Sequence, residues 1–137
     1  MSHEPPAGEH TPPRAPARAG AVILALECLG VLILAGVQVV DLIIGDVADP
    51  VSGIALIVLT VVGAAAVGAF AGATWRGASW GRSGGIVVQL MILAVAAGAL
   101  SGAYAQPLAG LALAVPAIIG LVVLVLAVRR AGASRRD

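Results

Sequence analysis

Long runs of apolar residues dominate the chain, and short polar segments separate them. Four runs, each near the roughly 20 residues that a helix needs to cross a bilayer, occupy residues 19–44, 51–73, 84–104 and 107–128. Such segments must be helical in lipid, because the bilayer offers no partner for free backbone groups. The pattern therefore predicts four transmembrane helices, of which the first is longer than needed and is expected to tilt.

The connections between these runs are short, at residues 45–50, 74–83 and 105–106. Short connections place consecutive helices antiparallel and adjacent, which predicts an all-α membrane protein built as a four-transmembrane-helix bundle. Composition agrees, since 60% of the residues are hydrophobic and only 11% are charged. A soluble domain carries about a quarter charged residues, so this chain is expected to face lipid.

The basic residues predict the orientation of the bundle. All eight are arginines, and all fall before the first span, between the second and third, or after the fourth: Arg14, Arg18, Arg76, Arg82, Arg129, Arg130, Arg135 and Arg136. The other two connections hold no basic residue. Because arginine-rich segments stay cytoplasmic, we expect both termini on the cytoplasmic side of the cell membrane.

The bundle, residues 18–130, is expected to lie between two cytoplasmic tails. Residues 1–17 are rich in proline and poor in apolar mass, which indicates disorder, and residues 131–137 form a basic tail. His3 and His10 are interpreted as solvated residues and not as metal ligands. The single cysteine, Cys28, cannot form an internal disulfide and is expected to be a small buried hydrophobe.

The second and fourth spans begin with similar residues. Pro50 and Gly53 recur as Pro107 and Gly110 at an offset of 57, and the sequence contains further matches such as Gly63 and Gly120. A tandem repeat of two helical hairpins would explain them and would relate the halves by an axis along the membrane normal. Biased composition and the preference for proline at helix starts also produce such matches, so both explanations stay open.

Small residues recur every four positions on two spans, as helices need for close contact in lipid. The two sets are Ala64, Gly68 and Gly72 on the second span and Ala94, Gly98 and Gly102 on the third. Contact within the chain is the preferred interpretation, ahead of a dedicated dimer interface. Pro116, in the middle of the fourth span, predicts a kink.

Glu27 is an ionisable residue at membrane depth, where a charge is costly and indicates a partner or a function. It shares one helical face with Val31, Leu34, Gln38 and Asp41, by spacings of four, three, four and three. We expect this face to point into the bundle.

Gln89 on the third span lies at a depth comparable to that of Glu27. At 1.5 Å per residue, Glu27 is about 13 Å from Arg18, and Gln89 is about 10 Å from Arg82. A hydrogen bond between a neutral Glu27 and Gln89 is therefore predicted, whereas Gln38 and Asp41 are expected near the outer interface. Glu27, Gln89, Gln38 and Asp41 form the candidate intramembrane polar site.

Two interpretations of Glu27 compete. In one, Glu27 is an interhelical hydrogen-bonding group, and in the other it is a proton or cation site on a transport pathway. Residues 27–30, Glu-Cys-Leu-Gly, resemble the first-helix E-x-x-G of small multidrug-resistance exporters, which are also four-helix proteins. The other spans lack the Trp and Tyr positions that this family places around its substrate, and its charge bias is weak. The structural interpretation is favoured, with transport as the alternative.

A closer resemblance involves residues 76–90, which read R-x-x-x-W-x-R-S-x5-Q-L. This segment, together with Leu26-Glu27, is similar to small actinobacterial integral membrane proteins, whose four-span layout matches nearly the whole chain beyond the tail. Gly84-Gly85 replaces a proline of that family. The resemblance implies no known activity. Four residues are expected to anchor this end at the lipid headgroups: Trp75, Arg76, Trp80 and Arg82.

Nothing in the sequence resembles a Ser/His/Asp set, a metal-ligand cluster or a phosphate-binding loop, so no enzyme and no cofactor are predicted. The expected function is that of a structural or accessory subunit that packs with other membrane helices. The expected partners are the lipid bilayer and either a second copy of the chain or a membrane complex, and not nucleic acid.

Overall fold

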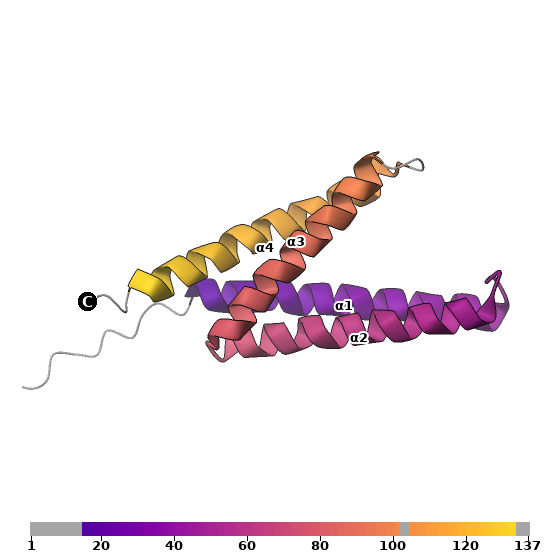
Figure 1. Cartoon of the computed structure of the whole chain (residues 1–137), viewed down its shortest axis with the longest axis horizontal. Coiled ribbons are helices and arrows are strands. Elements are labelled where there is room, and N and C mark those ends of the chain that lie inside the picture. The colour runs from indigo at the N-terminus through magenta and orange to yellow at the C-terminus, as the bar shows by residue number, and fades with distance from the viewer. Residues whose placement is uncertain (1–14, 102–104, 134–137) are drawn as a thin grey trace, which may run out of the picture.

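The computed structural model describes residues 15–101 and 105–133 and contains four long helices (Figure 1). These are α1 (Ala15–Ile44), α2 (Pro50–Trp75), α3 (Ser79–Ser101) and α4 (Pro107–Ala133). All four are long and apolar enough to cross a membrane. The four predicted spans are confirmed as helices over their described residues, while residues 102–104 of the third lie outside them. Both α2 and α4 begin at a proline, Pro50 and Pro107.

The helices extend beyond the apolar runs at the arginine-bearing end. Residues 15–17, predicted as tail, form the first turn of α1, and α4 continues to Ala133, past residue 128. The helix α3 begins at Ser79, so Trp80 and Arg82 lie in a helix and not in a loop. Hydropathy marks where apolar side chains stop, whereas a helix continues as long as its backbone hydrogen bonds are satisfied. The rest of the predicted tails lies outside the described residues.

Two glycines end helices in the left-handed conformation. Gly45 follows α1 with φ 78°, and Gly77 follows α2 with φ 80°. After α2, Gly77 N–H donates to Thr74 O and Ala78 N–H donates to Ala73 O, which is the Schellman arrangement. Glycine suits this conformation because it has no Cβ to clash. The chain therefore turns sharply from α2 into α3 within three residues.

Asp49 caps the N-terminus of α2. Its carboxylate accepts hydrogen bonds from the Ser52 hydroxyl and from the backbone N–H groups of Val51 and Ser52. The Ser52 hydroxyl has the largest effect, and together these donors hold the pKa of the Asp49 carboxyl below its usual range. A donor that binds the charged form favours that form, and a capping acid also suits the positive end of the helix dipole.

The Asp49 cap is expected to make stability depend on pH. Because the folded state lowers the pKa, the contribution is fully present above the unfolded pKa, about 3.9, and is lost as the pH falls through the folded value. The thermal unfolding temperature of wild type and Asp49→Asn, measured from pH 7 downward, should differ at neutral pH and converge in acid. Asp46→Asn, which removes a charge from the same connection, should show no such convergence. A constant difference at all pH values would contradict the assignment.

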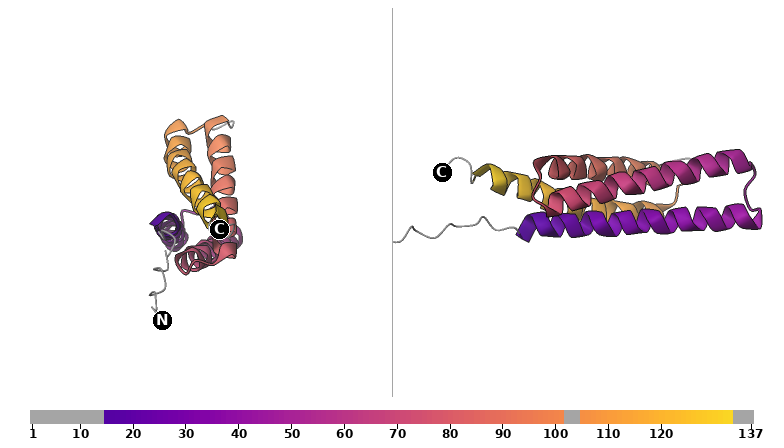
Figure 2. Two further views of the ribbon diagram at one scale, coloured as in Figure 1. Left: turned by 90° about the vertical axis from the view of Figure 1, so that its left-hand side faces the viewer. Right: turned by 90° about the horizontal axis from the view of Figure 1, so that it is seen from below.

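The four helices form two hairpins that meet at one end and diverge at the other. Helices α1 and α2 lie side by side along their length, as do α3 and α4, and the second hairpin crosses the first at an angle (Figures 1 and 2). The hairpins approach each other at the end that holds the α2–α3 turn. The expected four-helix arrangement is thus present, but its helices are not parallel throughout.

Close contact between the hairpins depends on glycines that face two leucines. Leu24 of α1 and Leu124 of α4 are fully buried, and they belong to the apolar core. A Cβ at Gly85 would lie 2.9 Å from Leu24 Cδ1 and 3.0 Å from Leu124 Cδ1, and one at Gly20 would lie 2.7 Å from Leu124 Cδ2. These glycines leave the space that the two leucines fill.

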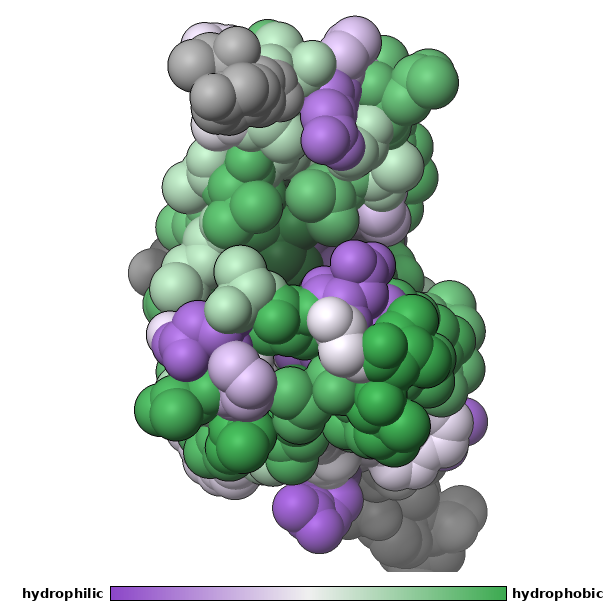
Figure 3. All heavy atoms as spheres, turned by 90° about the vertical axis from the view of Figure 1, so that its right-hand side faces the viewer, coloured by the Kyte–Doolittle hydropathy of each residue, from purple (hydrophilic) through white to green (hydrophobic). Residues whose placement is uncertain are grey.

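Apart from Glu27, the described charged residues are segregated between the two ends of the molecule. The five described arginines lie at the end where the hairpins meet, at the start of α1, around the α2–α3 turn and at the end of α4 (Figure 1). Asp46 and Asp49 lie in the connection at the opposite end. That end is largely hydrophobic, with hydrophilic residues in small separate groups (Figure 3). The predicted segregation of arginine to one end is confirmed for these five arginines. The remaining three lie outside the described residues: Arg14, Arg135 and Arg136.

The two sets of small residues behave differently. On α2, Ala64 is buried and a Cβ at Gly68 would lie 3.2 Å from Cys28 Sγ, so these two residues make contact within the chain as expected. A Cβ at Gly72 would meet only Arg76, 3.9 Å away. On α3, Ala94 is exposed and Gly98 has no atom within 4 Å of its Cβ position. For these two residues the prediction of contact within the chain is wrong, because α4 packs on a different face of α3; Gly102 lies outside the described residues.

Candidate intramembrane polar site

Glu27 and Gln89 are joined by hydrogen bonds between the two hairpins. The Gln89 Nε2 group donates to both carboxylate oxygens of Glu27, at 2.9 Å to Oε1 and 2.8 Å to Oε2. Glu27 is half-buried on α1 and Gln89 is fully buried on α3. The predicted contact is present, and it ties α1 to α3 at the depth that the helical rise indicates.

A glycine on a third helix makes room for the Gln89 amide. A Cβ at Gly120 of α4 would lie 2.6 Å from Gln89 Nε2 and 3.1 Å from Ile23 Cγ2. Gly120 is itself buried. The sequence singled out Gly120 only as a repeat position. Its matched residue Gly63 has no atom within 4 Å of its Cβ position, so the two occupy different environments.

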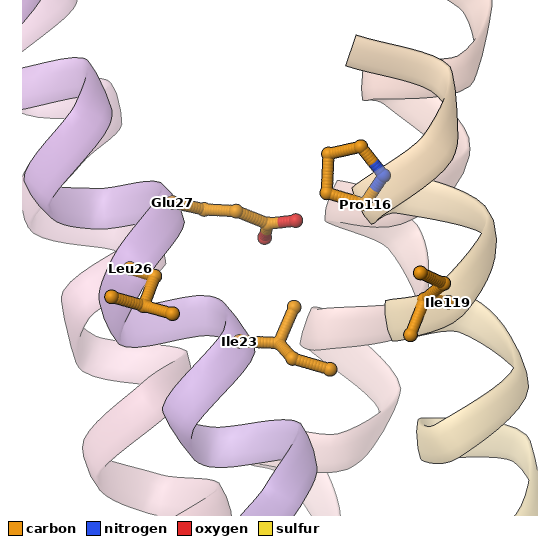
Figure 4. Close-up of a pocket in the computed structure, with 5 residues that line it drawn as sticks. All are labelled: Ile23, Leu26, Glu27, Pro116 and Ile119. Atoms are coloured by element: carbon orange, nitrogen blue, oxygen red, sulfur yellow. The ribbon is translucent and has the colours of Figure 1, made fainter. Parts of the chain in front are cut away.

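The Glu27 side chain extends from α1 toward Pro116 of α4 (Figure 4). It lines a groove of about 380 Å³, whose other lining residues are Ile23, Leu26, Pro116 and Ile119. Apart from Glu27, this lining is apolar. Helix α4 continues through Pro116 as one helix. Because proline has no N–H to donate, the carbonyl of Ala112 one turn earlier loses its usual partner. Sequence reasoning missed the proximity of Pro116 to Glu27, since the two are 89 positions apart.

Gln38 and Asp41 are not part of this cluster. They lie three and four turns further along α1, where both side chains are half-buried. Gln38 Oε1 is buried and has no hydrogen-bond partner among the described residues. Leu34, on the same face, is 52% exposed. The expectation that this face points into the bundle is therefore wrong at Leu34, because the second hairpin diverges from α1 there, whereas Gln38 and Asp41 are partly covered.

The four expected interfacial residues lie together around the α2–α3 turn. Trp75 and Trp80 are each more than half exposed. Trp80 packs edge-on against Phe70, with ring centroids 5.9 Å apart. Arg76 is exposed, and Arg82 Nη1 donates to Gly77 O at 2.8 Å, which closes the turn. Their exposed rings and guanidinium groups at one end suit a membrane–water boundary.

Sequence reasoning missed that Arg18 belongs to this group. Its guanidinium lies over the Trp75 ring, 5.7 Å from the centroid. The contact joins the start of α1 to the end of α2, which antiparallel helices bring together. The sequence does contain a signal for the Arg18–Trp75 contact. A basic residue precedes one span and a tryptophan ends the next, and antiparallel helices bring these two positions together.

The candidate site therefore combines one carboxylate, one amide and an apolar groove. Such a site can hold an interhelical hydrogen bond, or it can bind a proton or a cation at Glu27. Within residues 15–101 and 105–133, no three His, Cys, Asp or Glu side chains gather in a way that could hold a metal ion; His3 and His10 lie outside this part of the chain. No protein-family model, curated protein or solved structure matches the chain.

Proposed function

We propose that the chain is a multi-pass protein of the cell membrane, with both termini cytoplasmic, that acts as a structural or accessory subunit for other membrane helices. Four helices capable of crossing a membrane support the membrane location. The arginines gathered at one end support the orientation, because basic segments stay on the cytoplasmic side.

The opening between the hairpins is the observation that carries the subunit proposal. On the α1 face that begins with Glu27, Leu34 is exposed and Gln38 Oε1 is buried without a hydrogen-bond partner in the described part of the chain. A buried polar atom without a partner is costly. A helix from another chain that enters the opening would cover Leu34, and a change of the Gln38 rotamer would let its side chain meet a donor on that helix.

Crosslinking in native membranes tests this proposal. In a Cys28→Ala background, Leu34→Cys places a thiol in the opening, and Leu59→Cys places one on an exposed apolar position of α2. The expected result is a discrete crosslinked species with Leu34→Cys and none with Leu59→Cys. A species of twice the chain mass would identify a second copy as the partner. Absence of any crosslink at Leu34, with the thiol shown to be reactive, would contradict the proposal.

We also propose kinship with the small actinobacterial integral membrane proteins that residues 76–90 resemble. Two separate parts of the resemblance, Leu26-Glu27 and Gln89-Leu90, meet through the Glu27–Gln89 hydrogen bonds. Because the two segments contact each other, one hydrogen-bonded pair would explain why both occur together in the proteins that this chain resembles. Finding both segments with four spans in further actinobacterial chains would test this kinship.

Proton- or cation-coupled transport is the second candidate, and the groove at Glu27 favours it. Ionisable residues inside a membrane commonly mark ion pathways, and the groove gives the Glu27 carboxyl group space beside it. Proteoliposomes that show no flux of protons or monovalent cations would contradict this candidate.

Glu27→Gln separates the two functions. The variant is expected to change the free energy of unfolding by less than about 0.6 kcal/mol, the average worth of an interhelical hydrogen bond, because its amide oxygen still accepts from Gln89 Nε2. If transport operates, the same variant should abolish gradient-driven uptake, since it cannot exchange a proton. A large loss of folded protein would contradict the structural role of Glu27 as a hydrogen-bond acceptor.

A further inference from the structure

A second groove, separate from the one at Glu27, follows the α1–α2 hairpin at the arginine-bearing end. Its volume is about 360 Å³ and it contains no charged lining residue. Small side chains of both helices line most of it, and Trp75 lies at one end. The principal lining residues are Ala21, Ala25, Cys28, Gly68, Gly72 and Trp75.

The groove is hollow because, between Trp75 at one end and Cys28 at the other, most of its lining residues are alanine or glycine. At its inner end the helices are close, since Cys28 Sγ donates to Ala64 O at 3.2 Å. At Gly72 a Cβ would meet only the tip of Arg76, 3.9 Å away. From Trp75 to Gly68 the groove spans about 10 Å of helix. One leaflet of the hydrocarbon core is about 15 Å thick, so the groove would reach well into it.

A cationic cavity adjoins this groove at Trp75. It measures about 210 Å³, and its lining residues are Ala17, Arg18, Trp75, Arg76 and Gly77. Trp75 therefore lines both cavities. In the described part of the chain, no carboxylate forms an ion pair with Arg18 or Arg76. Two guanidinium groups thus lie beside Trp75, at the end of an apolar groove, with no carboxylate of the described residues paired to them.

We propose that the two cavities form one binding site for an anionic glycerophospholipid. The lipid phosphate would accept hydrogen bonds from Arg18 and Arg76, and one acyl chain would lie in the groove between Trp75 and Gly68. Arginine suits this role because its planar donors match phosphate oxygens. A lipid, and not free phosphate, is the proposed occupant because the cationic cavity shares Trp75 with an apolar groove that an acyl chain would fill.

The site rests on the proposed membrane placement, since it requires the arginine-bearing end to lie at the headgroup layer. It requires neither a protein partner nor transport. Accessibility labelling of cysteines at the two ends tests the placement. A failed lipid test with correct placement would therefore overturn only the lipid site.

Quenching of Trp75 fluorescence by lipids with brominated acyl chains tests the proposal. Trp80→Phe leaves Trp75 as the single tryptophan and retains an aromatic ring against Phe70. The full chain is reconstituted in vesicles that contain brominated phosphatidylglycerol or, separately, brominated phosphatidylcholine at the same mole fraction. The anionic lipid should quench more strongly. We define the preference as the affinity of the site for phosphatidylglycerol relative to phosphatidylcholine, obtained from the quenching. This preference should fall about fivefold for each of Arg18→Gln and Arg76→Gln, at about 1 kcal/mol per arginine.

Matched variants distinguish the site from general attraction to an anionic surface. Gly72→Leu fills the groove and should abolish the preference, whereas Gly63→Leu makes the same change on α2 where no atom lies within 4 Å and should preserve it. Arg129→Gln removes a charge from the same end outside the cavity and should also preserve it.

Three results would overturn the proposal. They are equal quenching by the two lipids, a preference that survives Gly72→Leu, or an equal loss with Arg129→Gln. Competition with glycerol 3-phosphate is a further test. If millimolar glycerol 3-phosphate removed the preference for the anionic lipid, the site would bind phosphate without an acyl chain, and the proposal would be overturned. Persistence of the preference in its presence supports a lipid held by both cavities.

Discussion

Gly81→Ala is expected to destabilise the folded protein by about 1–3 kcal/mol, the range for inserting a methyl group into a close contact. A Cβ at this position would lie 2.5 Å from the Thr74 backbone nitrogen and 2.7 Å from the Ala73 carbonyl carbon. Both atoms belong to the backbone of α2, so no side-chain rotation relieves the clash. The short α2–α3 turn prevents the two helices from separating freely. The free energy of unfolding in a denaturing detergent titration measures the effect.

Gly98→Ala is the matched control for this prediction. It makes the same substitution within α3, at a position where no atom lies within 4 Å. Alanine favours the helix over glycine by about 0.5–1 kcal/mol, so the control should be as stable as wild type or slightly more stable. If Gly81→Ala had the same free energy of unfolding as Gly98→Ala, the assignment of a close contact between α3 and the end of α2 would be wrong.

Gln89→Leu is expected to destabilise the protein by about 1–3 kcal/mol, because it leaves the Glu27 carboxyl group without its hydrogen-bond donor between the hairpins. Gln89 is fully buried, and Gly120 leaves its amide little free space. The same detergent titration measures the change, and circular dichroism confirms that the variant retains its helices.

The double variant Glu27→Leu/Gln89→Leu distinguishes a lost hydrogen bond from poor packing of leucine. Replacing both polar partners with apolar groups removes the cost of an unsatisfied acceptor, so the double variant should recover most of the loss. In a double-mutant cycle the two changes should thus be strongly non-additive. If the double variant were less stable than Gln89→Leu alone, Glu27 would have a stabilising contact other than Gln89. That result would contradict the assignment of Gln89 as the partner of Glu27.

The Glu27–Gln89 pair shows how far sequence reasoning reached into the site. Counting residues from the arginines at the membrane boundary placed both side chains at one depth, because helices that cross a bilayer have a fixed rise and a fixed start. The hydrogen bonds at 2.8 and 2.9 Å follow that prediction. The same reasoning failed for Leu34, since periodicity defines a helical face but not which neighbour covers it.

Gly120 and Pro116 show what the sequence left undetermined at the site. Both lie on α4, far from Glu27 along the chain, and a long apolar helix offers many rotations that satisfy its hydropathy equally. When nearly every residue is apolar, the pattern contains little information on which side faces protein and which faces lipid. Steric contact between particular side chains decides that rotation.

By itself, the sequence determined the four helices, their antiparallel order and the gathering of arginine at one end. These features depend on local properties, since backbone groups in lipid must pair within a helix and connections of a few residues leave no other path. Only the tertiary structure decided that the hairpins meet at the arginine end and diverge at the other. That arrangement depends on glycines such as Gly81 and Gly85, which allow two helices to touch, and on which residues happen to oppose them.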